Sequence, residues 1–407
     1  MVDELAGKGV GERIQIVRQR RGKTRAVVAG LVGRSEGWLK RVEKGQLLPP
    51  RLDMLIRLAE VLGVGDLTEL TGDSSVPLGM LRRAGHDTVP AIREAIEETP
   101  LIVSTEPRPD AAELAAQAAS AWRTWHSSVS PRADVGAVLA HLIRECSRAV
   151  RVLDGAERRI AAAALSEVYA LCEQVLAWVA EPALVWLTAD RCMQAAQQAD
   201  DPLVIAGAAW VVGNVQRATQ REEEALDLAN EAAELLAPRL EDGTDSHRAM
   251  WGALHLHGSI TAARMGREGD ARRHWDLGSD AARRLPDGYA HPWTVFGVAN
   301  ANITGVSVNV DLRQGRRALN EANKLDPDSV PSVERRARLW MEMARSYQQQ
   351  DDHTGTLSLM QRAVSVSAEA MRCHPLARGL IGELVTSGAP MVRNEARALA
   401  HQLGITA

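Results

Sequence analysis

The sequence predicts an all-α fold in which a head of short helices precedes a larger body of long helices, and three observations support this prediction. Apolar residues recur every three or four positions through most of the chain, which places them on one face of a helix. Of the 407 residues, 45% are hydrophobic and 25% are charged, a composition typical of folded globular proteins. Glycine, proline and capping residues divide the apolar pattern into short stretches up to residue 72 and into longer ones beyond residue 110.

Charge is distributed unevenly along the chain. Residues 8–57 contain thirteen lysines and arginines and only four acidic residues, whereas the whole chain has a net charge of −4. The remainder of the chain is therefore acidic. A basic segment at one end favours a nucleic-acid contact confined to that end, because neutralisation of phosphates drives such binding. A solvated basic surface without a partner is the alternative interpretation.

No segment approaches the roughly 18 apolar residues that a membrane-spanning helix needs, and residues 1–11 lack the apolar core of a signal peptide. We therefore expect a cytoplasmic protein that does not engage a membrane. The cysteines Cys146, Cys172, Cys192 and Cys373 form no CxxC pair and lie within apolar helical patterns. This pattern predicts buried thiols, no metal site and no cofactor.

The first two helices of the head are predicted from apolar spacing and from their end signals. The first covers residues 10–20, with Arg13 among the outward-facing residues, and Gly22 closes it. The second covers residues 25–32, where Thr24 is the N-cap and Leu31 is expected to face the core. Gly33 then supplies the turn to the next helix.

The third predicted helix covers residues 36–44 and begins after the N-cap Ser35. Leu39 and Val42 are three residues apart and point to the core. The solvent-facing residues of this helix are Glu36, Gly37, Trp38, Lys40, Arg41 and Lys44. A fourth helix over residues 51–62 and a short fifth one complete a five-helix domain, which we place at residues 1–72.

Residues 73–110 are predicted to connect the head to the body. This segment contains five prolines, and only residues 88–98 show helical spacing within it. The body, residues 111–407, is predicted to consist of helical hairpins stacked as repeats, because small residues recur where two helices of a hairpin would cross. Ala225, Ala271, Gly315 and Thr356 mark the second helices of four such units, and a shorter hairpin at residues 376–403 is expected to cap the stack.

The segment TRAVVAGLVGRSEGWLKRVEKG, followed by PPRLDMLIRLAEVLGV, resembles the Cro-repressor-like (XRE) family of helix-turn-helix regulators over about 60 residues. The resemblance implies a DNA-binding domain whose third helix lies in the major groove of an operator, and a homodimer that reads two half-sites. The candidate base-reading residues are Glu36, Gly37, Trp38, Lys40 and Arg41, and the candidate phosphate-binding residues are Arg25, Ser35, Lys40 and Lys44.

Alternatives remain open for three of these side chains. Arg41 is suited to guanine O6 and N7, although it could also bind phosphate. Glu36 could accept a hydrogen bond from cytosine N4 or serve only the helix dipole. Trp38 could contact a thymine methyl group or cover the core of the head. Gly37 leaves one base position without a side-chain reader.

One unit of the body has the spacing of the tetratricopeptide (TPR) consensus, carried by Trp340, Met343, Ala344, Tyr347, Thr356, Met360 and Ala363. The complete layout is similar to the RRNPP family of bacterial regulators, which implies a TPR-like α-solenoid that senses a signalling peptide or a small molecule. The first helices of the repeats would line a concave face. The candidate ligand-binding residues on it are Trp210, Asn214, Arg217, Asn300, Arg338, Arg345 and Gln348.

The sequence thus predicts a ligand-responsive transcriptional regulator. The alternative is a DNA-tethered scaffold whose repeats bind a partner protein without a diffusible effector. An enzyme is the weakest hypothesis, because His255 and His257 lie on different faces of a helix and no catalytic constellation accompanies them.

Overall fold

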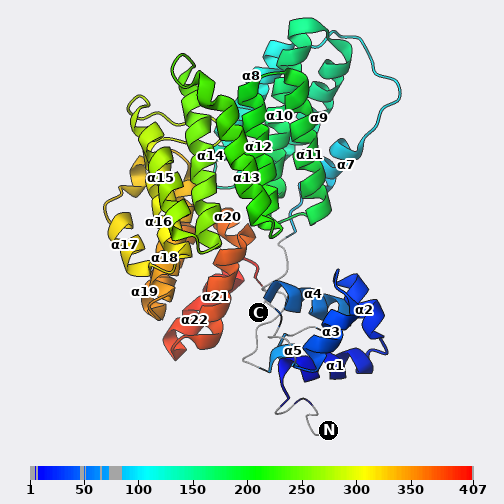
Figure 1. Cartoon of the computed structure of the whole chain (residues 1–407), viewed down its shortest axis with the longest axis vertical. Coiled ribbons are helices and arrows are strands. Elements are labelled where there is room, and N and C mark those ends of the chain that lie inside the picture. The colour runs from blue at the N-terminus through cyan, green and yellow to red at the C-terminus, as the bar shows by residue number, and fades with distance from the viewer. Residues whose placement is uncertain are drawn as a thin grey trace. The chain divides into compact units, whose positions relative to one another are not determined.

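The structure is a computed structural model and describes residues 5, 8–45, 50, 52–64, 67–72 and 85–405 (Figure 1). These residues form 21 α-helices, two short 3-10 helices and no β-strand, so the all-α prediction is confirmed. Contacts divide the chain into two compact units. The first contains residues 1–82 and 375–407, and the second contains residues 83–374.

The N-terminal part of the first unit has the five short helices that the sequence predicts. They are α1 (Val10–Arg20), α2 (Arg25–Leu31), α3 (Glu36–Glu43), α4 (Leu52–Leu62) and α5 (Thr68–Thr71). We call these helices the head. Ile14, Val28, Leu39 and Leu58 are completely buried in one apolar core that all five helices share. Residue 51, where the fourth helix was predicted to begin, lies outside the described residues.

Two side chains of the head differ from the prediction. Leu31 is 62% exposed, because Val28 and Val32 already supply the apolar contacts that the two-turn helix α2 makes with the core. Arg13 is buried instead of facing outward. Its guanidinium donates Nε to the carbonyl of Lys8 (2.8 Å) and Nη1 to the carbonyl of Thr68 (3.1 Å), which ties α1 to α5.

The first unit also contains α21 (Pro375–Ser387) and α22 (Pro390–Gln402), which pack against each other as a hairpin. This hairpin corresponds to the one predicted at residues 376–403. Its role as the cap of the repeat stack stays a prediction.

The second unit, which we call the body, begins with α7 (Val89–Glu97). Residues 73–84 of the predicted connector lie outside the described residues. Ile92 and Ile96 of α7 are buried in the core of the body, and the helix packs against α9. The helix predicted within the connector is therefore part of the body.

The long helices of the body follow in chain order, joined mostly by short loops. They are α8 (Ala111–Ser127), α9 (Pro131–Val152), α10 (Gly155–Leu176), α11 (Pro182–Ala199), α12 (Pro202–Ala218), α13 (Glu222–Leu236), α14 (Asp245–Arg264), α15 (Glu268–Arg283), α16 (Val298–Asp311), α17 (Gly315–Ala322), α18 (Val333–Gln348), α19 (His353–Val366) and α20 (Ala368–Cys373).

These helices stack as a solenoid of hairpins. From α10 onward each even-numbered helix to α18 pairs with the helix after it, and the successive even-numbered helices also contact one another. Ala225, Ala271, Gly315 and Thr356, the small residues predicted to mark second helices, all lie near the start of α13, α15, α17 and α19. All four are buried where each second helix crosses its neighbours. The small-residue pattern therefore marked the hairpins correctly.

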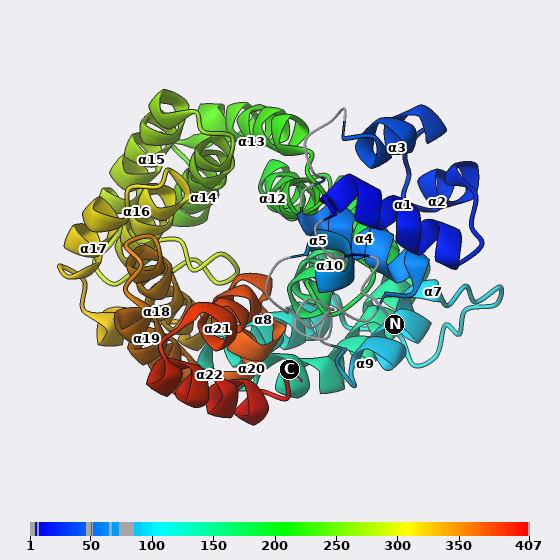
Figure 2. The ribbon, with the colours of Figure 1, turned by 90° about the horizontal axis from the view of Figure 1, so that it is seen from below.

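The solenoid of the body closes into a ring, which the sequence did not predict (Figure 2). Helix α18 contacts α8, and α20 contacts α9. The carboxylate of Glu369 in α20 accepts hydrogen bonds from the backbone amides of Arg132 (2.7 Å) and Ala133 (3.1 Å). These amides belong to the first turn of α9, where a negative charge also interacts favourably with the helix dipole. Glu369 thus joins the last helix of the body to one of the first.

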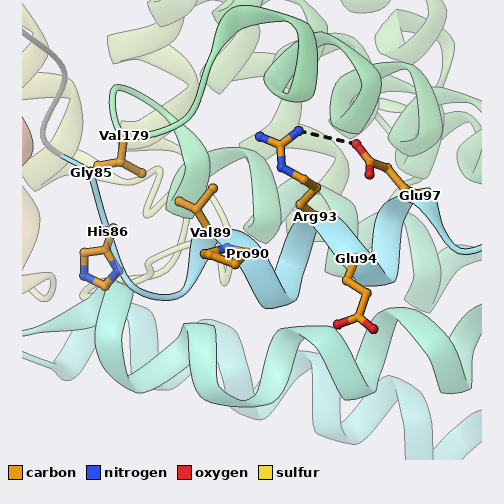
Figure 3. A pocket seen from close by; sticks show the side chains of 8 residues that line it. All are labelled: Gly85, His86, Val89, Pro90, Arg93, Glu94, Glu97 and Val179. Carbon is orange, nitrogen blue, oxygen red and sulfur yellow. Dashed lines mark hydrogen bonds and ion pairs between the residues drawn. The ribbon is translucent and has the colours of Figure 1, made fainter.

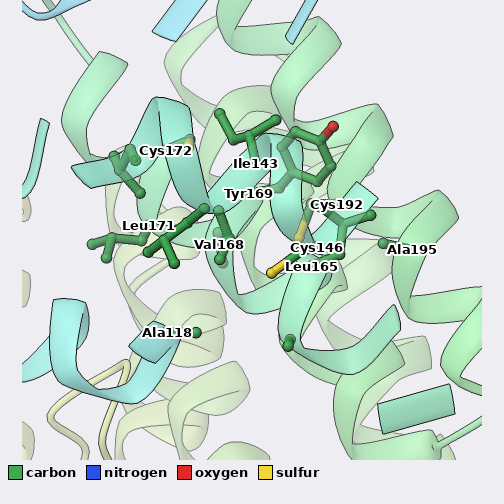
Figure 4. Close-up of a cluster of buried hydrophobic side chains, with 14 of the residues drawn as sticks. Ala118, Ile143, Cys146, Leu165, Val168, Tyr169, Leu171, Cys172, Cys192 and Ala195 are labelled. Atoms are coloured by element: carbon green, nitrogen blue, oxygen red, sulfur yellow. The ribbon is translucent and has the colours of Figure 1, made fainter. Parts of the chain in front are cut away.

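Three of the cysteines lie in the main core of the body (Figure 4). Cys146, Cys172 and Cys192 are completely buried among residues such as Val168 and Leu171. Burial raises the pKa of Cys146 and Cys192 to about 12, so both thiols stay protonated at neutral pH. All four cysteines are free, as predicted. Within the described residues, no helix has the length and apolar character needed to span a membrane.

Buried histidines give the body a predicted pH dependence. Burial lowers the pKa of His126, His255 and His291 to about 4, and it also lowers that of His257, His274 and His374. In the unfolded chain these rings titrate near pH 6.5. Between these pKa values the unfolded state binds more protons, so the free energy of unfolding falls as the pH falls. Burial also raises the pKa of two carboxyls, Glu167 and Glu173, to about 7. Their protonation in the folded state opposes the effect of the histidines, but the six histidines outnumber them.

We expect the midpoint of thermal unfolding of the body to decrease between about pH 7 and about pH 5. A single buried histidine contributes about 2 kcal/mol over this window. Circular dichroism melts of the full chain measure the effect, with His141→Gln as a control because His141 is exposed. A midpoint that is constant or higher at about pH 5 would show that the histidines do not dominate the titration.

Candidate nucleic-acid interface

Helix α3 begins at a side-chain cap. The hydroxyl of Ser35 accepts a hydrogen bond from the backbone amide of Trp38 (3.1 Å), and Ser35 itself has an extended backbone conformation. The turn before it passes through Gly33, whose φ of +71° lies in the left-handed region that favours glycine. Gly33 and Ser35 together set where the chain leaves α2 and where α3 begins.

The inner side of α3 packs closely on α1. Leu39 and Val42 are buried in the head core, as predicted. A Cβ atom on Gly11 would lie only 2.1 Å from the carbonyl oxygen of Val42, so α1 can approach the end of α3 only with glycine at this position. The sequence analysis did not identify Gly11. Its one signal was a glycine in the first turn of a helix, where it is unfavourable unless packing requires it.

A buried ion network fixes the end of α3 to α1 and α2. Glu43 is completely buried, and Arg18 donates to it through Nε (2.6 Å) and Nη2 (3.1 Å). Arg25 donates to the same carboxylate through Nε (2.5 Å). Arg25, predicted to bind phosphate, is thus 29% exposed and already paired with Glu43. Sequence spacing gave no sign of this, because the partners are 25 and 18 residues apart.

The outer side of α3 is polar and basic. Glu36, Gly37, Lys40, Arg41 and Lys44 are all exposed, as predicted. Among the described residues no ion pair engages Lys40, Arg41 or Lys44. A side chain at position 37 would meet no atom within 4 Å, so Gly37 leaves open space on this surface. We call this exposed set of five residues the α3 face.

Trp38 lies at the edge of the α3 face. Its ring is half-buried and packs against the head core, and the guanidinium of Arg34 lies 5.8 Å from its centroid. Of the two interpretations open for Trp38, this packing favours a cover for the core. Arg34, which the sequence analysis did not single out, adds another exposed cation beside the start of α3.

Comparison with known families supports the prediction that the head contains a helix-turn-helix domain. Residues 10–70 match a family described as a helix-turn-helix domain. The chain contains a helix-turn-helix domain. No curated protein matches the chain. The matched segment covers α1 to α4 and most of α5, and hence the α3 face, but it does not extend into the body.

Replacing Ser35 with alanine removes the cap of α3. We expect the free energy of unfolding of the helix-turn-helix domain to fall by about 1 kcal/mol, because the amide of Trp38 loses its acceptor. Hydrogen exchange of the α3 amides in the full chain measures the change. Ser120→Ala, at an exposed position within α8, should leave these amides unaffected. Equal exchange in both variants would show that Ser35 does not stabilise α3.

In the body, acidic partners engage two of the predicted ligand-binding arginines. Arg345 donates to Glu342 (2.6 Å) and to Asp311 of α16 (2.8 Å). Arg338 donates to the same Glu342 (2.7 Å), which is completely buried, and contacts His374 (2.6 Å). These arginines therefore link neighbouring helices. The sequence could not reveal Asp311 as a partner, because it belongs to the preceding repeat.

Arg217 is brought together with the predicted Asn214 on α12. Its Nη2 donates to Asn214 Oδ1 (2.9 Å), and its Nη1 donates to Thr261 Oγ1 on α14 (3.3 Å). Burial, together with the positive charges of Arg264 and Arg338, lowers the pKa of Arg217 to about 9. Both of these acceptors are neutral, as is the carbonyl of His257, to which Nη1 also donates (3.4 Å).

The remaining candidates of the predicted concave face have structural contacts. Trp210 is half-buried and packs against two apolar cores of the body. Asn300 donates to the carbonyl of Thr294 (3.3 Å), and Gln348 is half-buried near the end of α18. Binding of a ligand by these residues stays a prediction.

A cavity of about 440 Å³ lies beside α7 (Figure 3). The side chain of Arg93, which lines it, pairs with Glu97 (3.3 Å) and also with Glu181. Glu94 points away from that pair in the same view. Among the described residues that line the cavity, the guanidinium of Arg93 is therefore already engaged by acids. Within the described residues, no group of three or more His, Cys, Asp or Glu side chains could hold a metal ion.

Proposed function

We propose that the protein is a sequence-specific transcriptional regulator whose helix α3 reads operator DNA. The observation that carries the proposal is the α3 face, a basic and exposed helix side on a helix-turn-helix domain. In this class of domain the N-terminal part of the second helix of the motif contacts base edges in the major groove. The buried Arg18–Glu43–Arg25 network holds that helix rigidly on its supporting helices.

Each residue of the α3 face receives a role from its chemistry. Arg41 donates two hydrogen bonds to guanine O6 and N7, and Glu36 accepts from cytosine N4. Lys40 and Lys44 bind phosphates, and Ser35 contributes a phosphate contact beside its capping role. Gly37 lets the helix approach the bases closely at one position.

We also propose that the protein binds DNA as a homodimer. One helix of eight residues reads only a few base pairs, and regulators of this kind gain specificity by placing two copies on half-sites about one helical turn apart. We therefore propose a two-fold symmetric operator.

Selection of bound fragments from genomic DNA, followed by footprinting, tests the proposal. We expect two protected half-sites with centres about 10 base pairs apart and an affinity that falls steeply with salt. Equal affinity for all fragments at physiological salt would contradict sequence-specific reading.

For the body we propose a sensor of a peptide or small molecule. The stacked hairpins support it, since such stacks form extended binding surfaces, and so does the buried Arg217, whose guanidinium donates to the neutral groups of Asn214 and Thr261. The alternative is a scaffold that binds a partner protein. Thermal-shift and operator-binding assays with size-fractionated culture extract separate the two, because a sensor responds to the low-mass fraction and a scaffold only to the macromolecular fraction.

A further inference from the structure

A second cavity of the body lies between α15, α16 and α17 and has a volume of about 360 Å³, within the usual range of small-molecule sites. None of the residues predicted for the concave face lines it. Its lining residues are Arg272, Trp275, Asn302, Gly305, Asn309, Arg317, Glu321, Lys324 and Leu325.

Trp275 forms a fixed flat wall of this cavity. Its indole Nε1 donates to the carbonyl of Ala301 on α16 (2.9 Å), which sets the orientation of the ring. A Cβ atom on Gly305 would lie 2.9 Å from the same nitrogen, so the glycine makes room for the indole. The ring itself remains only half-buried.

Cations predominate around the cavity. Arg272, Arg317 and Lys324 line it together with a single acid, Glu321, which pairs with Lys324 (3.1 Å). Arg317 is exposed, and among the described residues no ion pair engages it.

The polar groups of Arg272 are only partly satisfied. Its Nη2 donates to Asn309 Oδ1 (2.7 Å), to Gln314 Oε1 (2.8 Å) and, in an ion pair, to Glu268 Oε1 (3.4 Å). Its Nε is buried and has no acceptor among the described residues. A buried donor of this kind costs free energy unless an acceptor reaches it.

We propose that this cavity binds a small molecule that combines a flat apolar ring with an anionic group, either a carboxylate or a phosphate. The ring stacks on Trp275, and the anion lies between Arg317 and the unsatisfied Nε of Arg272. Asn302 also lines the cavity and offers an amide to further polar atoms of the ligand. The proposal holds whether or not the head binds DNA.

Isothermal titration of the full chain with benzoate, phenyl phosphate and the neutral benzamide tests the proposal. We expect at least one of the two anions to bind at millimolar concentration, and benzamide to bind about tenfold more weakly or not at all. The better anion identifies the group that the cavity prefers. Arg317→Gln should weaken that anion about tenfold. Arg316→Gln, at the neighbouring exposed position that does not line the cavity, should have no effect.

Trp275→Phe provides a second test, with circular dichroism melts to confirm folding. It removes the hydrogen bond that orients the ring, and we expect weaker binding of the anion with an unchanged preference for it over benzamide. Three results would overturn the proposal: no binding of either anion, equal binding of benzamide, or equal effects of Arg317→Gln and Arg316→Gln.

Discussion

Replacing Arg41 with alanine lowers operator affinity by about 10- to 100-fold and relaxes discrimination at one base pair of each half-site. A guanidinium that donates to both guanine O6 and N7 contributes about 1–3 kcal/mol of discrimination. Arg41 is exposed on α3 with no ion pair among the described residues, so its removal leaves the fold of the domain intact. Fluorescence anisotropy with the selected operator and with single-base variants measures both effects.

Arg57→Ala is the matched control for this experiment. Arg57 is also an exposed arginine of the head, but it lies on α4 and outside the α3 face. We expect only a small, sequence-independent loss of affinity. If Arg41→Ala weakens all DNA sequences equally, Arg41 binds phosphate, and if it has no effect, α3 is not the reading helix.

Replacing Glu43 with alanine destabilises the helix-turn-helix domain by about 3–5 kcal/mol, because it leaves Arg18 buried without its counter-charge. Arg25 loses its partner in the same step. We expect operator binding to be lost together with protection of the α1 to α3 amides, whereas the body retains its protection. Hydrogen exchange of the full chain measured by mass spectrometry resolves the two units.

Glu36→Ala is the control for charge alone, because Glu36 is an exposed acid on the same helix. It should change stability by less than about 0.5 kcal/mol. Unchanged protection in Glu43→Ala would contradict a stabilising role for the buried network.

Local signals in the sequence predicted the helices of the head almost completely. The expected ends of α1 and the expected start of α3 agree with the structure, and the end of α3 differs by one residue. These ends could be predicted because Ser35 and Gly45 act on the backbone next to them. The exposed side of α3 was predicted for the same reason, since a helix with two inward apolar residues leaves the remaining positions to solvent.

Long-range polar contacts could not be predicted in this way. Arg13 was predicted to face outward, yet it is buried because the carbonyl of Thr68, far along the chain, accepts from it. Arg18 is likewise buried because it reaches the carboxylate of Glu43. Closure of the body depends on Glu369, which caps a helix 237 residues away. Apolar periodicity carries no information about such partners, and for the same reason it did not reveal the ion pairs of Arg338 and Arg345, two of the predicted ligand-binding residues.

Hydroxyl-radical footprinting of the full chain on its selected operator tests the central claim most directly. We predict protection of two major-groove segments about one helical turn apart, together with interference by guanine N7 methylation at the base that Arg41 contacts, and loss of that interference in Arg41→Ala. A footprint that is confined to the minor groove, or methylation interference that persists in Arg41→Ala, would contradict the assignment of α3 as the reading helix.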